Sequence, residues 1–233
     1  MTTPFSFLYS LPLLSRITGE LDEALRGGCI RKIYQEGGSV TLDIHVRGGT
    51  HILWLSIRPP RLHLSSSRPI GHPPRPPAFC QALRKYLVNA RVVEISCHPI
   101  LPVVTMAARS RGEGEGGRIV ALVAELTGQF SNLLLLDAPP SPEASPRILH
   151  LLRTFTSANR RVAIHEDYRL PHLSPGLRRR IEGGLGLDDL DLSAGGTSFP
   201  CNEAVARFVE ERLQETAERD ARRRVVRLLR QAR

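Results

Sequence analysis

The chain of 233 residues has very little lysine, no paired cysteine motif and no long hydrophobic run. Lys32 and Lys85 are its only lysines, so arginine supplies nearly all of the 32 cationic side chains, which outnumber the 23 acidic ones. The net charge of +9 indicates an anionic partner such as nucleic acid or a membrane surface, and a general compositional bias of the source is the alternative. With 41% hydrophobic residues, the chain can still build the core of one large domain or of a domain plus a small appendage.

The cysteines, at positions 29, 80, 97 and 201, are far apart and include no Cys-x-x-Cys pair. This spacing gives no support to a zinc ribbon or a thioredoxin-like site, and it predicts buried, reduced thiols. No segment reaches the roughly 20 apolar residues of a membrane span. The apolar start, MTTPFSFLYSLPLLSR, lacks a charged leading region and a small-residue cleavage site. We therefore expect a cytoplasmic protein without a membrane partner.

Patterns that would indicate catalysis are also missing. Cys97 and His98 are neighbours, and because consecutive strand residues point to opposite faces, they do not address one another as nucleophile and base. The histidines show no H-E-x-x-H or cysteine spacing for a metal. RSRGEGEGGR (109–118) has no following helix and no Lys-Ser/Thr pair, so it predicts a hairpin loop rather than a phosphate cradle. We predict a non-enzyme with no cofactor, metal or small-molecule substrate.

The first part of the chain alternates helix and strand signals. Apolar residues recur at the helical period from Leu13 to Arg26, and a glycine pair then stops the pattern. The runs CIRKIYQ, SVTLDIHV and THILWLSI, separated by further glycine pairs, predict an antiparallel meander. The proline-rich segment 65–77 predicts a surface connection, and a polyproline ligand for a partner's groove is the alternative.

A short helix and a second set of strands are predicted next. The helix lies in PPAFCQALRKYL (76–87), where Arg84 and Lys85 point away from the apolar stripe. That stripe consists of Phe79, Leu83 and Leu87. VVEISCH, PVVTMAAR, RIVALVAEL and SNLLLLD follow as strand-like runs, and RILHLLRTF (147–155) fits a strand or a short helix equally well.

The last part of the chain is predicted to be helical. Ser174 as N-cap, Pro175 at the first helical position and a glycine pair past the end delimit the helix LRRRIE. With the shorter DDLDLS it predicts a helical hairpin whose glycine turn can meet a phosphate. Residues 202–233 lack glycine and proline and predict one long helix. Its apolar stripe thins over 214–224, as in a helix that enters solvent or an open coiled coil.

Basic residues on these helices are candidate phosphate contacts. They are Arg84, Lys85, Arg178, Arg179, Arg180, Arg222, Arg223 and Arg224. A solvated face is the alternative for each of them. The arginine triples favour a bound anion, because adjacent cations repel one another unless something screens them.

Five segments, in this order, resemble the NFACT family of ribosome-associated quality-control factors, some of which are also known as fibronectin-binding proteins. They are GGCIRKIYQ (27–35), RLHLSS (61–66), PPAFCQALRKYL (76–87), VAELTGQFSNLLLLD (123–137) and LSPGLRRRI (173–181). The closing CNEAVARFVEERLQETAERDARRRVVRLL is similar to the start of that family's coiled coil.

The resemblance implies an α+β fold. Residues 1–170 would form a β-sandwich with flanking helices, similar to the N-terminal domain of formamidopyrimidine-DNA glycosylase. Residues 171–201 would form a helix-hairpin-helix module, and 202–233 the long helix. The related glycosylases react through an N-terminal Pro-Glu pair, whereas Pro4 here is internal and has no carboxylate beside it. Its nitrogen is a tertiary amide that cannot form a Schiff base, so we reject glycosylase chemistry.

The resemblance also implies partners. Family members bind the large ribosomal subunit with a stalled nascent chain and recruit tRNA, so that a tail is added without a template. Two alternatives stay open. The first is a protein-interaction scaffold whose terminal helix is half of a coiled coil, and the second is adhesion to an extracellular protein such as fibronectin.

Three positions depart from the family pattern. An Asp within a Phe-Asp-Gly run, near the start of the first helix, aligns with Ser10. An Asp-Arg pair aligns with Leu101 and Pro102. Both motifs are tied to tailing in the family, and the chain ends before the family's C-terminal RNA-binding domain. The resemblance therefore implies a protein that binds RNA but is deficient in tailing by itself.

Overall fold

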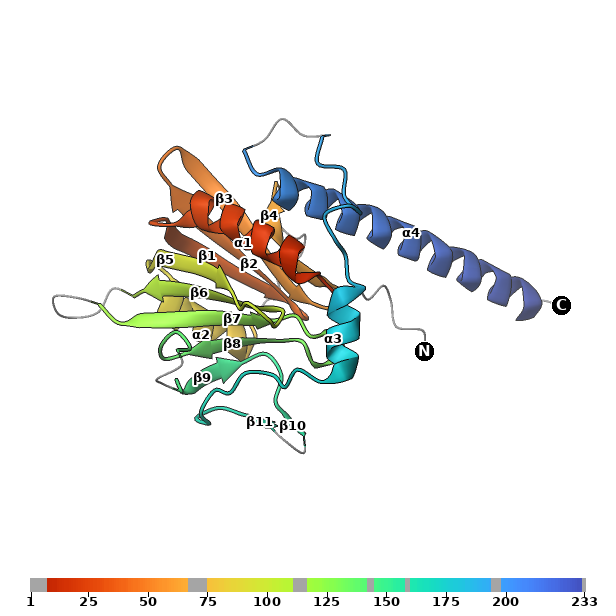
Figure 1. The fold of residues 1–233 in the computed structure, drawn as a ribbon. Coiled ribbons are helices and arrows are strands. Elements are labelled where there is room, and N and C mark those ends of the chain that lie inside the picture. Colours follow the sequence, from red (N-terminus) through yellow and green to blue (C-terminus); the bar gives the residue numbers. More distant parts are fainter. Residues whose placement is uncertain are drawn as a thin grey trace.

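Helices and strands assemble around a large antiparallel sheet (Figure 1). The computed structural model describes residues 8–66, 75–110, 117–141, 145–157, 160–193 and 198–231, with side chains through residue 224. The helices are α1 (Leu11–Leu25), α2 (Ala78–Leu87), α3 (Pro175–Glu182), α4 (Pro200–Gln231) and the short 3-10 helix η1 (Gly128–Phe130). The strands are β1 (Cys29–Glu36), β2 (Ser39–Val46), β3 (Gly49–Ile57), β4 (Pro60–Ser65), β5 (Arg91–Cys97), β6 (Val103–Arg109), β7 (Ile119–Glu125), β8 (Asn132–Leu136), β9 (Ile148–Leu151), β10 (Phe155–Ser157) and β11 (Arg160–Val162).

Nine of these strands form one sheet in the order β4-β3-β2-β1-β5-β6-β7-β8-β9. The predicted meander is confirmed as β1, β2 and β3, which pair antiparallel. The ambiguous segment RILHLLRTF contains a strand, β9, because Ile148 and Leu151 pair with β8. Strands β1 and β5 are in register only at Cys29 and Arg91. This short junction divides the sheet into two halves, β1–β4 and β5–β9. The α+β fold with flanking helices is therefore confirmed.

Helices α1 and α2 carry the apolar stripes that the sequence predicted. The α1 helix begins after Ser10, whose hydroxyl oxygen accepts a hydrogen bond from the N–H of Leu13 at 3.4 Å. In α2 the stripe residues Phe79, Leu83 and Leu87 are all buried. Figure 1 shows α1 on the near face of the sheet and α2 behind it.

Two clusters of buried apolar side chains hold the elements together. The larger cluster joins strands of both halves to α1, α2 and the first turns of α4 (201–209). The smaller cluster joins Leu8 and Leu101 to the α3 residues Leu177 and Ile181. Full burial of one such side chain contributes about 1.5–3 kcal/mol relative to exposure. Both α3 and the base of α4 are therefore packed into the core.

The first turn of α4 is fastened by Glu20, a buried carboxylate of α1. Its Oε1 accepts the N–H of Cys201 at 3.0 Å, and its Oε2 accepts the N–H of Asn202 at 2.9 Å. Oε2 also accepts the Asn202 side-chain amide at 2.9 Å. The first amides of a helix have no partner within the helix, and a carboxylate there also interacts favourably with the helix dipole. Glu20 therefore fixes where the long helix starts.

The edge strand β4 is capped by two side chains from elsewhere in the chain. The N–H of Leu62 donates to the buried hydroxyl of Tyr9 at 3.2 Å, and the N–H of Leu64 donates to Oδ1 of Asn202 at 3.2 Å. An edge strand normally leaves such amides exposed. Here Tyr9, which precedes α1, and Asn202 of α4 accept their hydrogen bonds.

The long helix α4 begins at Pro200, two residues before the predicted start, and is described to Gln231. Val205 and Val209 are buried, whereas residues 214–224 are exposed apart from Thr216, which is half-buried. Glu215 and Arg219, one helical turn apart, form an exposed ion pair, with 3.7 Å between Oε2 and Nη2. Among the described residues, no helix is long and apolar enough to cross a membrane.

The second helix of the predicted hairpin is absent, because DDLDLS forms a turn followed by irregular chain. Leu185 instead makes a β-bridge with Tyr9, which fixes the chain as soon as α3 ends. Asp189 then accepts the N–H of Gly186 at 2.7 Å, and Asp191 accepts the N–H of its near neighbour Ser193 at 2.9 Å. Aspartate favours such local turns over helix interiors.

The thiols are unpaired, as predicted, and only two of them are fully buried. Cys80 and Cys201 are buried, whereas Cys29 and Cys97 are half-buried. Two other predictions concern segments that lie largely outside the described ranges and stay predictions. They are the proline-rich connection at 65–77, of which 67–74 is not described, and the hairpin loop at 109–118, of which 111–116 is not described.

His63 on β4 should make stability depend on pH. Burial lowers the pKa of His63 to about 4, and its Nδ1 lies 2.8 Å from the carbonyl oxygen of Leu64. Unfolded chains bind the imidazole proton below a pKa near 6.5, whereas the folded protein does so only near pH 4. Stability should therefore fall as the pH drops through this window, by about 3 kcal/mol in total.

Urea unfolding at pH 7 and at pH 4.5 measures this effect. The variant His63→Gln should flatten the pH dependence, and the control His45→Gln, at an exposed histidine, should leave it unchanged. An equally steep pH dependence in all three proteins would contradict the prediction.

Candidate nucleic-acid interface

Of the two predicted basic residues on α2, Arg84 is part of the packing. Its side chain is half-buried, and its Nε donates to the carbonyl oxygen of Ile33 on β1 at 2.9 Å. It therefore fastens α2 to β1 rather than pointing away into solvent. Its neighbour Lys85 is exposed, with the ammonium 5.3 Å from the centre of the Tyr86 ring.

The two arginine triples are exposed and lie on different helices. Arg178–Arg180 lie on α3 at one end of the sheet, and Arg222–Arg224 lie in the part of α4 that extends away from it (Figure 1). With α2 behind the sheet, the eight predicted contacts do not form one surface. The guanidinium of Arg180 lies against Gly128.

The three substituted family positions all lie close to the α3 end of the molecule. Ser10 caps α1 and its N–H donates to the carbonyl oxygen of Leu185 at 2.9 Å. Leu101 is buried in the same apolar cluster as α3, and the carbonyl oxygen of Pro102 accepts the N–H of Leu126 at 2.8 Å. Positions that carry charge in the family pattern therefore serve here in capping and packing.

An arginine-lined pocket that the sequence analysis missed lies at the opposite end of α1. Its volume is about 490 Å³, and it adjoins the ends of α1, β1, β2 and β5. The arginines that line it are Arg26, Arg31, Arg47 and Arg91. The remaining lining residues are glycine, cysteine, histidine, valine and asparagine, so the pocket wall contains no carboxylate.

Three of these arginines are positioned by local contacts. Arg31 Nη1 lies 3.3 Å from Oδ1 of Asn89, and Arg91 Nη1 donates to the carbonyl oxygen of Gly27 at 3.0 Å. These partners are neutral, so they orient the guanidinium groups without cancelling their charge. Arg26 differs, because it forms an ion pair with Asp22 outside the pocket wall at 2.6 Å.

Sequence reasoning missed the pocket because its arginines come from different elements. Arg26 follows α1, Arg31 lies in β1, Arg47 lies in the β2–β3 turn and Arg91 begins β5. The pairing of Cys29 with both His45 and Arg91 brings these segments together. The one available signal was that Arg26 and Arg47 each precede a glycine pair, where a turn exposes them.

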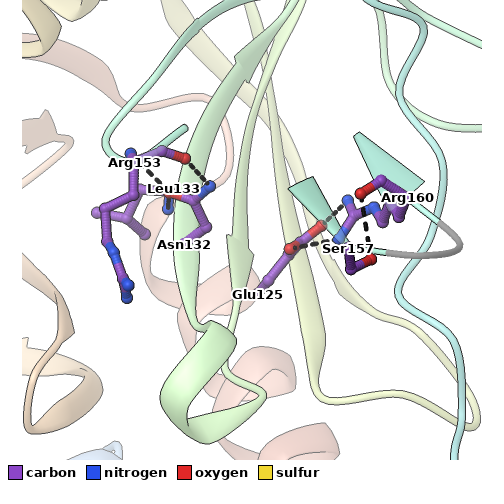
Figure 2. A network of polar contacts seen from close by, with 6 residues as sticks. All are labelled: Glu125, Asn132, Leu133, Arg153, Ser157 and Arg160. Atoms are coloured by element: carbon purple, nitrogen blue, oxygen red, sulfur yellow. Dashed lines mark hydrogen bonds and ion pairs between the residues drawn. The ribbon is translucent and has the colours of Figure 1, made fainter. Parts of the chain in front are cut away.

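The best-defined polar network at the other end of the sheet is structural (Figure 2). Arg160 binds both carboxylate oxygens of Glu125, at 2.9 and 2.5 Å, and the two side chains are 10% and 0% exposed. Its guanidinium also lies over the rings of Phe155 and Tyr168. This ion pair attaches the β10–β11 hairpin to β7 and faces no pocket wall described above.

Thiols and possible metal ligands are the other groups that could supply a reactive site. Burial raises the pKa of Cys97 to about 11, so its thiol stays protonated at neutral pH. Within the described ranges, no group of three histidine, cysteine, aspartate or glutamate side chains is placed to hold a metal ion. The arginine pocket, by contrast, has a strongly cationic wall.

Known proteins match this sequence and fold. A family model for the NFACT N-terminal and middle domains matches residues 11–180. The chain is 30% identical over 158 residues to the Rqc2 homolog RqcH of Bacillus subtilis, which covers 66% of this chain and 27% of that protein. It is 26% identical over 201 residues to RqcH of Streptococcus suis, covering 75% of this chain and 36% of that protein. The chain thus spans about a quarter to a third of the length of these relatives.

Two solved structures have a similar fold. The N-terminal part of the fibronectin/fibrinogen-binding protein of Streptococcus suis superimposes with a TM-score of 0.63 at 26% identity, covering 70% of this chain and 61% of that one. The N-terminal domain of the fibronectin-binding protein PavA of Streptococcus pneumoniae gives 0.61 at 25% identity, covering 87% of this chain and 80% of that one. Since the family model matches most of the chain, this protein belongs to the NFACT family.

Proposed function

We propose that this protein is an RNA-binding factor of ribosome-associated quality control that binds the large ribosomal subunit and tRNA. It acts by binding rather than by catalysis, and it does not tail nascent chains by itself. Family membership and the names of the RqcH relatives support the process. The arginine pocket carries the proposal for this chain.

The chemistry of the pocket suits a polyanion. Guanidinium groups are always charged at neutral pH and bind phosphate oxygens through a planar pair of donors. Arg31 and Arg91 are oriented by neutral groups, so their charges stay available to an anion. Because no carboxylate lines the wall, and only Arg26 of its arginines is paired with one just outside it, the wall attracts a phosphate.

The tailing deficiency follows from the substituted positions. Ser10 has no charge, and neither Leu101 nor Pro102 can supply a carboxylate or a guanidinium. Leu101 is also buried, so no partner can reach it without opening the α3 cluster. A separate feature is the exposed part of α4, over 214–224. Its surface can pair with a partner helix in a coiled coil, as the predicted scaffold role requires.

Binding to purified large subunits and to tRNA should weaken steeply with salt, and the slope should depend on the pocket. Each phosphate neutralised contributes roughly 0.7–0.9 to the slope of log affinity against log salt concentration. The combined variant Arg31→Ala, Arg47→Ala and Arg91→Ala should therefore lower the slope by about 2 to 3. Filter binding or fluorescence anisotropy between low and physiological salt measures it.

The control removes the same charge elsewhere. Arg118, Arg161 and Arg212 each form an exposed ion pair with an acidic residue, and their joint replacement by alanine should change the slope far less. Equal losses in both variants would show that only net charge matters. Binding that is absent or insensitive to salt would overturn the proposal.

Adhesion is a second candidate, because two of the structural relatives carry fibronectin-binding names. A surface assay with immobilised fibronectin tests it. Saturable binding that survives the pocket variant, together with no affinity for ribosomal subunits, would favour adhesion over RNA binding.

A further inference from the structure

An exposed aromatic ring lies on the short turn between β7 and β8. Phe130 ends η1, and half of its surface (50%) is exposed. The Phe155 ring packs beside it, with the two ring centres 6.0 Å apart and a tilt of 37° between the rings. A single exposed apolar residue needs no explanation. Phe130 differs from such a residue because cationic side chains lie beside its turn.

Two guanidinium groups from later parts of the chain lie beside the turn. Arg153, which follows β9, donates from Nη1 to the carbonyl oxygen of Gln129 at 3.2 Å. Arg180 of α3 lies so close to Gly128 that a Cβ there would be 3.0 Å from its Nη1. Gly128 has φ +83, a backbone conformation that favours glycine.

The charge beside the turn is not neutralised. Neither Arg153 nor Arg180 forms an ion pair with a carboxylate of the described residues. Burial lowers the pKa of Arg153, and so does the positive charge of Arg58 nearby. Arg58 is therefore a further cation near Arg153, and cations without a carboxylate partner attract an anion.

A buried amide fixes Arg153 in place (Figure 2). Asn132, which is fully buried, donates from Nδ2 to the carbonyl oxygen of Arg153 at 2.8 Å. Its Oδ1 accepts the N–H of Arg153 at 3.0 Å and that of Leu133 at 3.0 Å. Both backbone groups of Arg153 are therefore held by one side chain that starts the strand after the turn. Asn132 is a positioning residue for the guanidinium beside Gln129.

We propose that this turn, Gly128–Phe130 with Arg153 and Arg180, seats one unpaired nucleotide of a single-stranded RNA segment. The inference rests on the proposed function and adds a second contact to it. The base stacks on the open face of Phe130, and Arg153 and Arg180 bind the adjoining phosphate. Unstacked bases of single strands are the ones that aromatic side chains recognise, because duplex bases already cover one another. An acidic peptide would use the cations but not the ring face.

The probe for this seat is a short single-stranded oligouridylate, compared with an RNA duplex of equal length. Loss of one base–aromatic stack should weaken single-strand binding by roughly 5- to 100-fold in Phe130→Ala. The Phe130→Tyr variant should retain it, and the duplex affinity should change less than about twofold. Arg153→Gln should lower the salt slope for the single strand by about 0.7.

Two controls keep the test decisive. Leu192→Ala removes another exposed apolar side chain, far from the turn in sequence, and should have no effect on either probe. Circular dichroism of Phe130→Ala should match the parent, since the ring is only half-buried. If single strand and duplex lose affinity equally, or a polyglutamate peptide competes as well as the oligouridylate, the seat is wrong. If Phe130→Ala still binds ribosomes in a salt-dependent manner, the proposed function holds even though the nucleotide site is wrong. If the parent protein shows no salt-dependent ribosome binding, the proposed function is wrong as well.

Discussion

Glu125→Ala should lower the free energy of unfolding by about 3–5 kcal/mol, the largest effect we expect of any single substitution. The change removes the carboxylate that pairs with Arg160 through both oxygens. Arg160 is only 10% exposed, so its charge would stay buried without a partner. That uncompensated charge, rather than the lost attraction, accounts for most of the cost. Urea unfolding followed by circular dichroism measures it.

The double variant Glu125→Leu with Arg160→Met tests the cause. It removes both charges and should recover much of the lost stability, since a well-packed apolar pair is often as stable as a buried ion pair. Arg161→Ala, which breaks the exposed pair with Glu166, is the control and should cost at most about 1 kcal/mol. If the double variant is less stable than Glu125→Ala, the buried charge is not the reason.

Glu20→Ala should release the base of α4 and lower the free energy of unfolding by about 2–4 kcal/mol. Without the carboxylate, the amides of Cys201 and Asn202 lose their acceptors in a buried position. The Asn202 side chain would lose one partner as well. Hydrogen exchange measured over 201–209 should accelerate far more than exchange in β5–β8, because only the first of these regions depends on Glu20.

The matched control for this prediction is Glu23→Ala, which removes an exposed carboxylate from the same helix. It should leave both exchange and unfolding nearly unchanged. Uniformly faster exchange across the whole protein in Glu20→Ala would mean that the residue supports global stability instead of the attachment of α4.

The parts of this fold that were predicted are those set by short-range pattern. The stripe of Phe79, Leu83 and Leu87 specifies a helix and its buried face from 10 residues alone, and Ser174 with Pro175 specifies where α3 begins. RILHLLRTF was ambiguous because its own pattern suits both structures. Pairing with β8, which is a tertiary contact, decides it.

The candidate site was harder to predict because it depends on contacts between distant segments. Nothing near Arg31 in the sequence indicates Arg91, which reaches it only because β1 pairs with β5. Arg84 was predicted as a solvent-facing cation because the helical period cannot show that the carbonyl oxygen of Ile33 lies within its reach. Likewise, the aspartates of DDLDLS counted as helix residues, whereas Asp189 and Asp191 bind nearby backbone.

The capping of β4 has a consequence for self-association. A free sheet edge is where a second molecule adds a strand, which leads to domain swapping or fibrils. Because Tyr9 and Asn202 already occupy the amides of Leu62 and Leu64, this border offers no ladder for another chain to join. Asn202, which Glu20 holds at the start of the long helix, thereby also protects this edge of the sheet from strand addition.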